Sequence, residues 1–242
     1  MRFDWRLRSG IAGPANFVAM LAVLSVFPLI LRWTGALSVA NVSPESPEHS
    51  QAFLKFCFVL TGFLWLIFCI ALVGIRQCGK ITWRQLIGTE MRGWRSVAGH
   101  LGVAIAAFVG MAVIGNLSNS ILGPLQHDRA VFQSMIAKSG VEALAFLVLA
   151  ISAGFVEEFV FRGYIQRQCH ALCGNTALAA FLQIAIFTQG HFYQGWLRLV
   201  PVMLIGLVLT ITALWRKSLV PGMIAHGFGD GLVSFMFFFK HL

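Results

Sequence analysis

Long apolar runs separated by short polar connections dominate the chain. Each run holds about 20 residues, the length that an α-helix needs to cross the hydrocarbon core of a bilayer. The pattern predicts seven transmembrane helices, at about Ile11–Leu31, Phe53–Ile75, Val97–Leu117, Val141–Cys169, Thr176–His191, Leu197–Trp215 and Met223–Phe239. The fourth run is longer than one crossing requires. With no repeat and no sign of a second domain, we expect an all-α bundle that forms a single integral membrane domain over residues 1–242.

The composition agrees with this pattern. Hydrophobic residues make up 58% of the chain and charged residues only 11%, whereas an average soluble domain has about 45–50% and 25%. A soluble globular protein is therefore excluded, and the lipid bilayer is the first expected partner. In such a chain the net charge of +9 does not indicate a nucleic-acid partner, and we expect none.

The Lys and Arg residues predict the orientation. Twelve of the 18 basic residues fall on one side of the predicted bundle, and five of them lie between the second and third runs. Because basic connections are retained in the cytoplasm, we expect a cytoplasmic N-terminus and an external C-terminus. The first run could instead be a signal peptide, but its length and the polar residues after it favour a transmembrane helix.

Two acids and a base interrupt the fourth run. A charged side chain at membrane depth costs at least a few kcal/mol, so it is rarely kept without a partner or a use. On a helix Glu158 and Arg162 are four residues apart with the acid first, the favourable order for an ion pair. Glu157 lies about 100° around the helix from Glu158, so it points elsewhere and is free for chemistry. The alternative is a structural ion pair beside a glutamate that faces water.

Two later segments also place polar side chains at helical spacing. Phe187 and His191 are four residues apart in the first segment. His226 and Asp230 have the same spacing in the second. A single histidine in an apolar helix is often only a hydrogen-bonded core residue. Since polar groups in lipid seek one another, we expect one intramembrane cavity that gathers Glu157, Glu158, His191, His226 and Asp230.

A cavity with these groups is suited to hydrolysis. A carboxylate and a neutral imidazole that share a water molecule can deprotonate it as it attacks a carbonyl. A second histidine and a neighbouring hydrogen-bonding group can then stabilise the oxyanion, without a nucleophilic Ser or Cys. The same side chains could instead hold a divalent metal such as zinc, with Glu157, His191 and His226 as ligands. The HExxH motif is absent, and we expect no cofactor.

The three motifs, in this order, resemble those of the family of type II CAAX prenyl endopeptidases and bacteriocin-processing proteins. The similarity covers about residues 142–239, the predicted catalytic core. It implies a helical membrane bundle with a cavity open toward the cytosol, and an endopeptidase that cleaves a membrane-associated protein or peptide. It also implies roles: Glu157 as general base, His191 as its partner on the water, His226 and Asp230 as the oxyanion site, and Glu158, Arg162 and Phe187 as supports. Family members have been described both as metalloproteases and as metal-independent glutamate peptidases, so the resemblance leaves the metal open.

Two features complicate this resemblance. The third motif of the eukaryotic members typically ends in Asn, whereas here it ends in Asp230, which must be protonated to donate to an oxyanion or must orient His226 instead. The Asp form resembles the prokaryotic branch, so we expect a prokaryotic plasma membrane and no necessary prenyl group. The second feature is depth, because Glu157 lies toward the inner end of one run and His191 toward the outer end of the next. They can meet only if the fourth helix runs deeper, with residues 162–168 partly within the membrane.

Two other classes of protein fit some of the same observations. A proton- or cation-coupled transporter also uses intramembrane carboxylates and histidines, but the chain has no obvious inverted repeat. A non-catalytic membrane protein, such as an immunity or scaffold protein, would tolerate replacement of Glu157.

Overall fold

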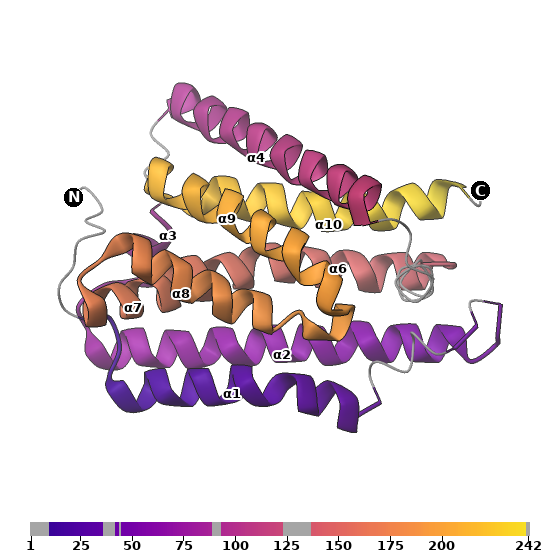
Figure 1. Ribbon diagram of the computed structural model, residues 1–242, viewed down its shortest axis with the longest axis horizontal. Helices are drawn as coiled ribbons and strands as arrows, with labels where there is room; N and C mark the ends of the chain where they lie inside the picture. The colour runs from indigo at the N-terminus through magenta and orange to yellow at the C-terminus, as the bar shows by residue number, and fades with distance from the viewer. Residues whose placement is uncertain (1–9, 36–41, 44, 89–92, 123–136, 241–242) are drawn as a thin grey trace.

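The computed structural model describes residues 10–35, 42–43, 45–88, 93–122 and 137–240. Within these ranges every regular element is a helix, and the long helices run alongside one another (Figure 1). The long helices are α1 (Pro14–Trp33), α2 (His49–Cys78), α4 (Gly93–Leu122), α6 (Gly140–Glu157), α9 (Leu199–Arg216) and α10 (Val220–Lys240). The shorter helices are α3 (Trp83–Ile87), α7 (Gln166–Cys173) and α8 (Thr176–Gln189).

The described residues contain five helical stretches long and apolar enough to cross a membrane. They are Pro14–Leu31, His49–Cys78, Gly93–Ile121, Gly140–Cys173 and Trp196–Arg216, and they correspond to the first four and the sixth predicted spans. The predicted membrane helix bundle is thus confirmed. Seven crossings are not, because α8 is shorter and α10, which covers the seventh predicted span, is not among the five.

The outer surface of the bundle is suited to lipid. On α4 every fourth residue is a large apolar side chain that lies exposed, and these residues are Leu101, Ile105, Val109, Val113 and Leu117. Such a stripe would be costly against water, but it has the character of the lipid tails that surround a membrane helix. The protein is therefore an integral membrane protein.

The helix α6 lies at the centre of the bundle, and it packs against α2 on one side and α10 on the other (Figure 1). Glycines allow α6 and α10 to approach closely, because a Cβ atom added at Gly154 would lie 2.5 Å from the backbone nitrogen of Gly227. Small residues commonly permit such crossings in membranes. This crossing carries the third motif, on α10, to the first motif at the end of α6.

The outermost helix, α1, is held to the bundle by side-chain hydrogen bonds. The Asn16 side chain donates to the carbonyl of Ile70 on α2 at 3.0 Å and accepts from the hydroxyl of Tyr164. Near the start of α1, the Gln168 carboxamide oxygen accepts from the backbone N–H of Ile11, and its nitrogen donates to the carbonyl of Ala12 at 3.0 Å. These bonds connect α1 to the helical segment that carries the first motif.

Six bases of the described part lie at one end of the bundle. This end contains the last turn of α2, the short helix α3, the start of α4 and the end of α9 (Figure 1). Its basic residues are Arg76, Lys80, Arg84, Arg95, Arg216 and Lys217. Its assignment to the cytoplasm stays a prediction.

Candidate active site

The first motif lies where the winding of the helix changes. The helix α6 ends at Glu157, residues Glu158–Ile165 form a π-helix (η2), and α7 resumes at Gln166. Short π-helical insertions of this kind are frequent at functional sites. The whole stretch Gly140–Cys173 spans 34 residues, which confirms that the fourth helix is longer than one crossing. Residues 158–170 are all buried in the bundle.

Glu158 and Arg162 form the predicted ion pair. The Arg162 guanidinium donates to the Glu158 carboxylate at 2.9 Å, and both side chains are completely buried. The guanidinium also donates to the carbonyl of Gly206 on α9 at 3.2 Å and lies 4.4 Å from the centre of the Phe187 ring. The cation–π contact gives Phe187 of the second motif a structural role beside the first motif.

His226 lies among three carboxylates. Its Nδ1 is 3.1 Å from the Glu158 carboxylate, and its Nε2 is 3.5 Å from Asp230 and 3.8 Å from Glu157. A carboxylate accepts hydrogen bonds, so Nδ1 carries a hydrogen toward Glu158. Glu158 therefore holds both Arg162 and the ring of His226, a second contact that the helical spacing did not predict.

His191 does not lie on a helix, contrary to the sequence prediction. The helix α8 ends at Gln189, and His191 occupies the turn before a short 3-10 helix (η3, Phe192–Gln194). Its Nδ1 lies 2.9 Å from the carbonyl oxygen of Phe187, which can only accept. Nδ1 therefore carries the hydrogen, and in the neutral ring Nε2 keeps a lone pair.

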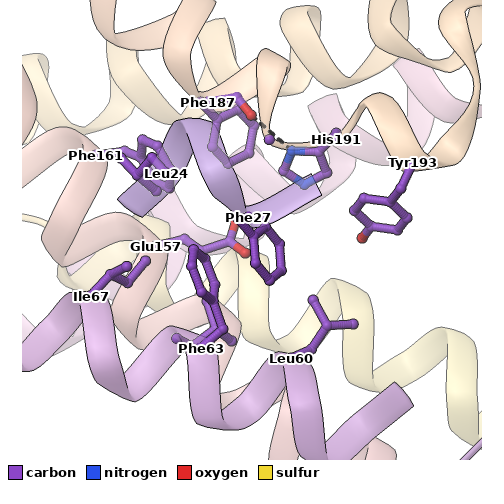
Figure 2. A pocket seen from close by; sticks show the side chains of 12 residues that line it. Leu24, Phe27, Leu60, Phe63, Ile67, Glu157, Phe161, Phe187, His191 and Tyr193 are labelled. Atoms are coloured by element: carbon purple, nitrogen blue, oxygen red, sulfur yellow. Dashed lines mark hydrogen bonds between the residues drawn. The ribbon is translucent and has the colours of Figure 1, made fainter. Parts of the chain in front are cut away.

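Glu157 and His191 line the same small space, which we call the hollow. The other residues that line it are mostly apolar and come from α1, α2, η2, α8, the turn after α8, and η3: Leu24, Phe27, Leu60, Phe63, Leu64, Ile67, Phe161, Phe187, Gly190 and Tyr193. Figure 2 shows the carboxylate of Glu157 and the ring of His191 on this space. Its volume is about 40 Å³. One water molecule needs roughly 10–15 Å³ of such volume, so the hollow has room for water.

The predicted convergence of five polar residues on one cavity is met only in part. Glu157 and His191 line the hollow, whereas Glu158, His226 and Asp230 do not. His226 adjoins the hollow through its contact with Glu157. The expected difference in depth between Glu157 and His191 does not keep them apart, because both reach the hollow.

Two parts of the site were missed by sequence reasoning. Six of the hollow's residues come from α1 and α2, from which only hydropathy had been read. The other part is Tyr193, two residues after the second motif, which presents a polar aromatic side chain to the hollow. Its position so close to His191 was a usable signal, since the whole chain contains only two tyrosines.

The alternative metal site is not formed by the residues that the structure describes. Among them, no three His, Cys, Asp or Glu side chains are gathered so that they could hold a metal ion. The donor set Glu157, His191 and His226 is thus not arranged as a ligand cluster. That hydrolysis needs no metal stays a prediction, which chelator treatment of the purified protein tests.

The fold and the site define a class of protein: a helical membrane protein whose acids and histidines at the site come from three ordered motifs. Residues 139–232 match the family model described as type II CAAX prenyl endopeptidase Rce1-like. This segment includes all three motifs, and by it the C-terminal part of the chain is similar to the family of CAAX-type membrane endopeptidases. No curated protein and no solved structure matched the chain.

Proposed function

We propose that this protein hydrolyses a peptide bond of a membrane-associated protein or peptide, with a water molecule activated by Glu157 and His191. One observation carries the proposal. A carboxylate and an imidazole with a free Nε2 line one hollow that has room for water, inside a segment that matches a family of membrane endopeptidases.

The proposed reaction begins with the water in the hollow. Nε2 of His191 accepts a hydrogen bond from this water and orients it, while the Glu157 carboxylate takes its proton. The water oxygen attacks the carbonyl carbon, and the electron pair of the carbonyl moves to its oxygen. When the tetrahedral intermediate collapses, the carbon–nitrogen bond breaks and Glu157 returns the proton to the leaving nitrogen. No covalent bond to the protein is needed.

His226 serves the same reaction by stabilising negative charge. Its Nδ1 hydrogen is directed to Glu158, so the ring donates to the oxyanion through Nε2, as the doubly protonated imidazolium that its three carboxylate neighbours favour. Asp230 lies 3.5 Å from that Nε2, a position from which a carboxylate orients the ring. We therefore assign to Asp230 the orienting role, and not that of a direct donor to the oxyanion.

The proposal includes a location. The Asp ending of the third motif, the form that resembles the prokaryotic branch, supports a prokaryotic plasma membrane, and the basic end of the bundle supports a cytoplasmic N-terminus. A cysteine introduced at position 80 should therefore not react with an impermeant maleimide in intact cells. Labelling of this cysteine would contradict the orientation.

The decisive experiment compares membrane proteomes of cells that express the wild type, Glu157→Gln or Glu142→Gln. Glu142 is a matched control, because it is the other acid of α6, is buried, and accepts from the backbone N–H of Lys138 at 2.7 Å. New protein ends should appear with the wild type and Glu142→Gln and be absent with Glu157→Gln. Their sequences identify the substrate and the bond. Equal ends with Glu157→Gln would exclude the assigned base.

A further inference from the structure

Tyr193 lies against His191 at the edge of the hollow. The two rings are nearly parallel, with centroids 6.1 Å apart and an angle of 23° between their planes. The edge of Phe56 on α2 holds the phenol from another direction, with a centroid distance of 6.5 Å. Figure 2 shows the hydroxyl directed into the open space between His191 and Leu60.

The hydroxyl of Tyr193 has a hydrogen to donate. The side-chain nitrogen of Gln194 donates to the phenol oxygen at 3.1 Å, and an amide N–H cannot accept in return. In the part of the chain that the structure describes, no acceptor takes the phenol hydrogen. A donor without an acceptor beside a catalytic acid and histidine is available to a substrate atom.

The proposed reaction lacks one such donor. An oxyanion is commonly stabilised by two or more hydrogen bonds, and His226 supplies one through Nε2. Asp230 cannot supply the second while it is ionised, and its oxygen is placed against His226. Tyr193 lines the hollow together with Glu157 and His191, so its side chain borders the space in which the proposed reaction takes place.

We propose that Tyr193 is an additional catalytic residue, whose hydroxyl donates a hydrogen bond to the oxyanion. The inference rests on the proposed function. In the step concerned, the water oxygen bonds to the carbonyl carbon, the water proton passes to Glu157, and the carbonyl electron pair becomes the oxyanion. Tyr193 keeps its proton throughout and shares it with this oxygen until the carbonyl forms again.

The first test compares Tyr193→Phe with Tyr164→Phe. The chain has two tyrosines, so the same atom is removed once at the hollow and once in η2, where the hydroxyl of Tyr164 bonds to Asn16. With a peptide that spans the cleaved bond, we expect Tyr193→Phe to lower kcat by roughly 10²–10³-fold at unchanged KM, as the loss of one oxyanion donor does. Tyr164→Phe should keep the kcat of the wild type, because in the intact chain the Gln168 bonds to Ile11 and Ala12 still hold α1 in place.

The second test measures binding without turnover. A peptide phosphinate of the same sequence carries a tetrahedral anion in place of the cleaved amide. Tyr193→Phe should weaken the binding of this phosphinate by the same factor by which it lowers kcat/KM. The binding of the uncleaved peptide is measured in the inactive Glu157→Gln protein. There, the added Tyr193→Phe substitution should leave the peptide affinity unchanged. A role in packing His191 would not separate the two ligands.

The outcomes distinguish the two proposals. If the wild type cleaves nothing, the peptidase proposal fails. If the wild type cleaves, Glu157→Gln does not, and Tyr193→Phe keeps the wild-type kcat or phosphinate affinity, the peptidase proposal stands and the role of Tyr193 is refuted.

Discussion

At the scale of single residues, Arg162 joins the three motifs. Its guanidinium is completely buried and contacts the Glu158 carboxylate, the carbonyl of Gly206 and the face of Phe187. Glu158 in turn bonds to His226. A planar guanidinium can satisfy these partners together, because it presents several N–H groups in fixed directions and a flat face to an aromatic ring.

We therefore expect Arg162→Ala to destabilise the protein by about 3–5 kcal/mol, the usual cost of leaving one member of a buried pair alone. Arg162→Lys keeps the charge but cannot reproduce the planar contacts, so its loss should be smaller. Urea unfolding of the detergent-solubilised variants measures both. Arg162→Ala as stable as the wild type would show that the pair contributes nothing to the fold.

Much of this residue-scale arrangement could be predicted. The pairing of Glu158 with Arg162 follows from their spacing, as does the separate direction of Glu157. The additional bond from Glu158 to His226 could not be predicted, because residues 68 positions apart carry no local signal of their contact. The bond between Nδ1 of His191 and the carbonyl of Phe187 could not be predicted either, for a different reason. Helical periodicity indicates which residues share a face, but it does not show that the helix ends before His191.

At the scale of helices, the crossing of α6 and α10 sets the distance from Glu157 to His226. A Cβ atom at position 154 would lie 2.6 Å from the Cα atom of Gly227 and 2.8 Å from the carbonyl oxygen of Met223. Both are backbone atoms, so the two helices must move apart to accept it. Such overpacking typically costs about 1–3 kcal/mol.

Gly154→Ala should therefore lower stability by about this amount and reduce cleavage, because His226 moves with α10. Gly102→Ala is the matched control, since a Cβ atom at this exposed position of α4 meets nothing within 4 Å. It should leave activity unchanged and raise helix stability by up to about 1 kcal/mol. Thermal unfolding and peptide cleavage report the two effects. A normal Gly154→Ala enzyme would mean that the helices approach less closely.

The helices themselves were largely predictable, but their irregular parts were not. The length of the apolar runs predicted the five spans that contain α1, α2, α4, α6 and α9. The fifth predicted span continued to His191, whereas α8 ends at Gln189, directly before Gly190. The π-helix at Glu158–Ile165 has no counterpart in the hydrophobic pattern. Its buried polar side chains bond to partners on other helices, such as Gly206 on α9 and His226 on α10. These partners come together only in the folded bundle, so a local sequence pattern cannot indicate them.

At the scale of the whole molecule, the site extends beyond the segment that matches the family. Residues 139–232 carry the three motifs, yet α1 and α2 provide one wall of the hollow through side chains that include Leu24, Phe27, Leu60 and Phe63. The sequence did not distinguish these residues from other apolar residues that face lipid. The catalytic core proposed at residues 142–239 is thus open on one side when it is taken alone.

This dependence can be tested by dividing the chain between residues 88 and 93, so that α4 stays with the segment that carries the motifs and only α1, α2 and α3 are separated. The second fragment alone should cleave no more than Glu157→Gln does, because the hollow lacks the wall from α1 and α2 and cannot hold its water apart from the lipid. Co-expression of the first fragment should restore cleavage, since the bonds from Asn16 to Tyr164 and from Gln168 to Ile11 bring α1 back to its place. Peptide cleavage in membranes from each strain is the measurement.

Two glycines of α2 make the reassembly specific. A methyl group at Gly74 would collide with the Asn16 side chain, whereas one at Gly62 meets nothing within 4 Å. A first fragment with Gly74→Ala should therefore restore less activity than one with Gly62→Ala, although both helices keep the same apolar length. If the second fragment cleaves fully by itself, the first two helices are only a membrane anchor. If both glycine variants restore activity equally, the wall forms without the contact between Asn16 and α2.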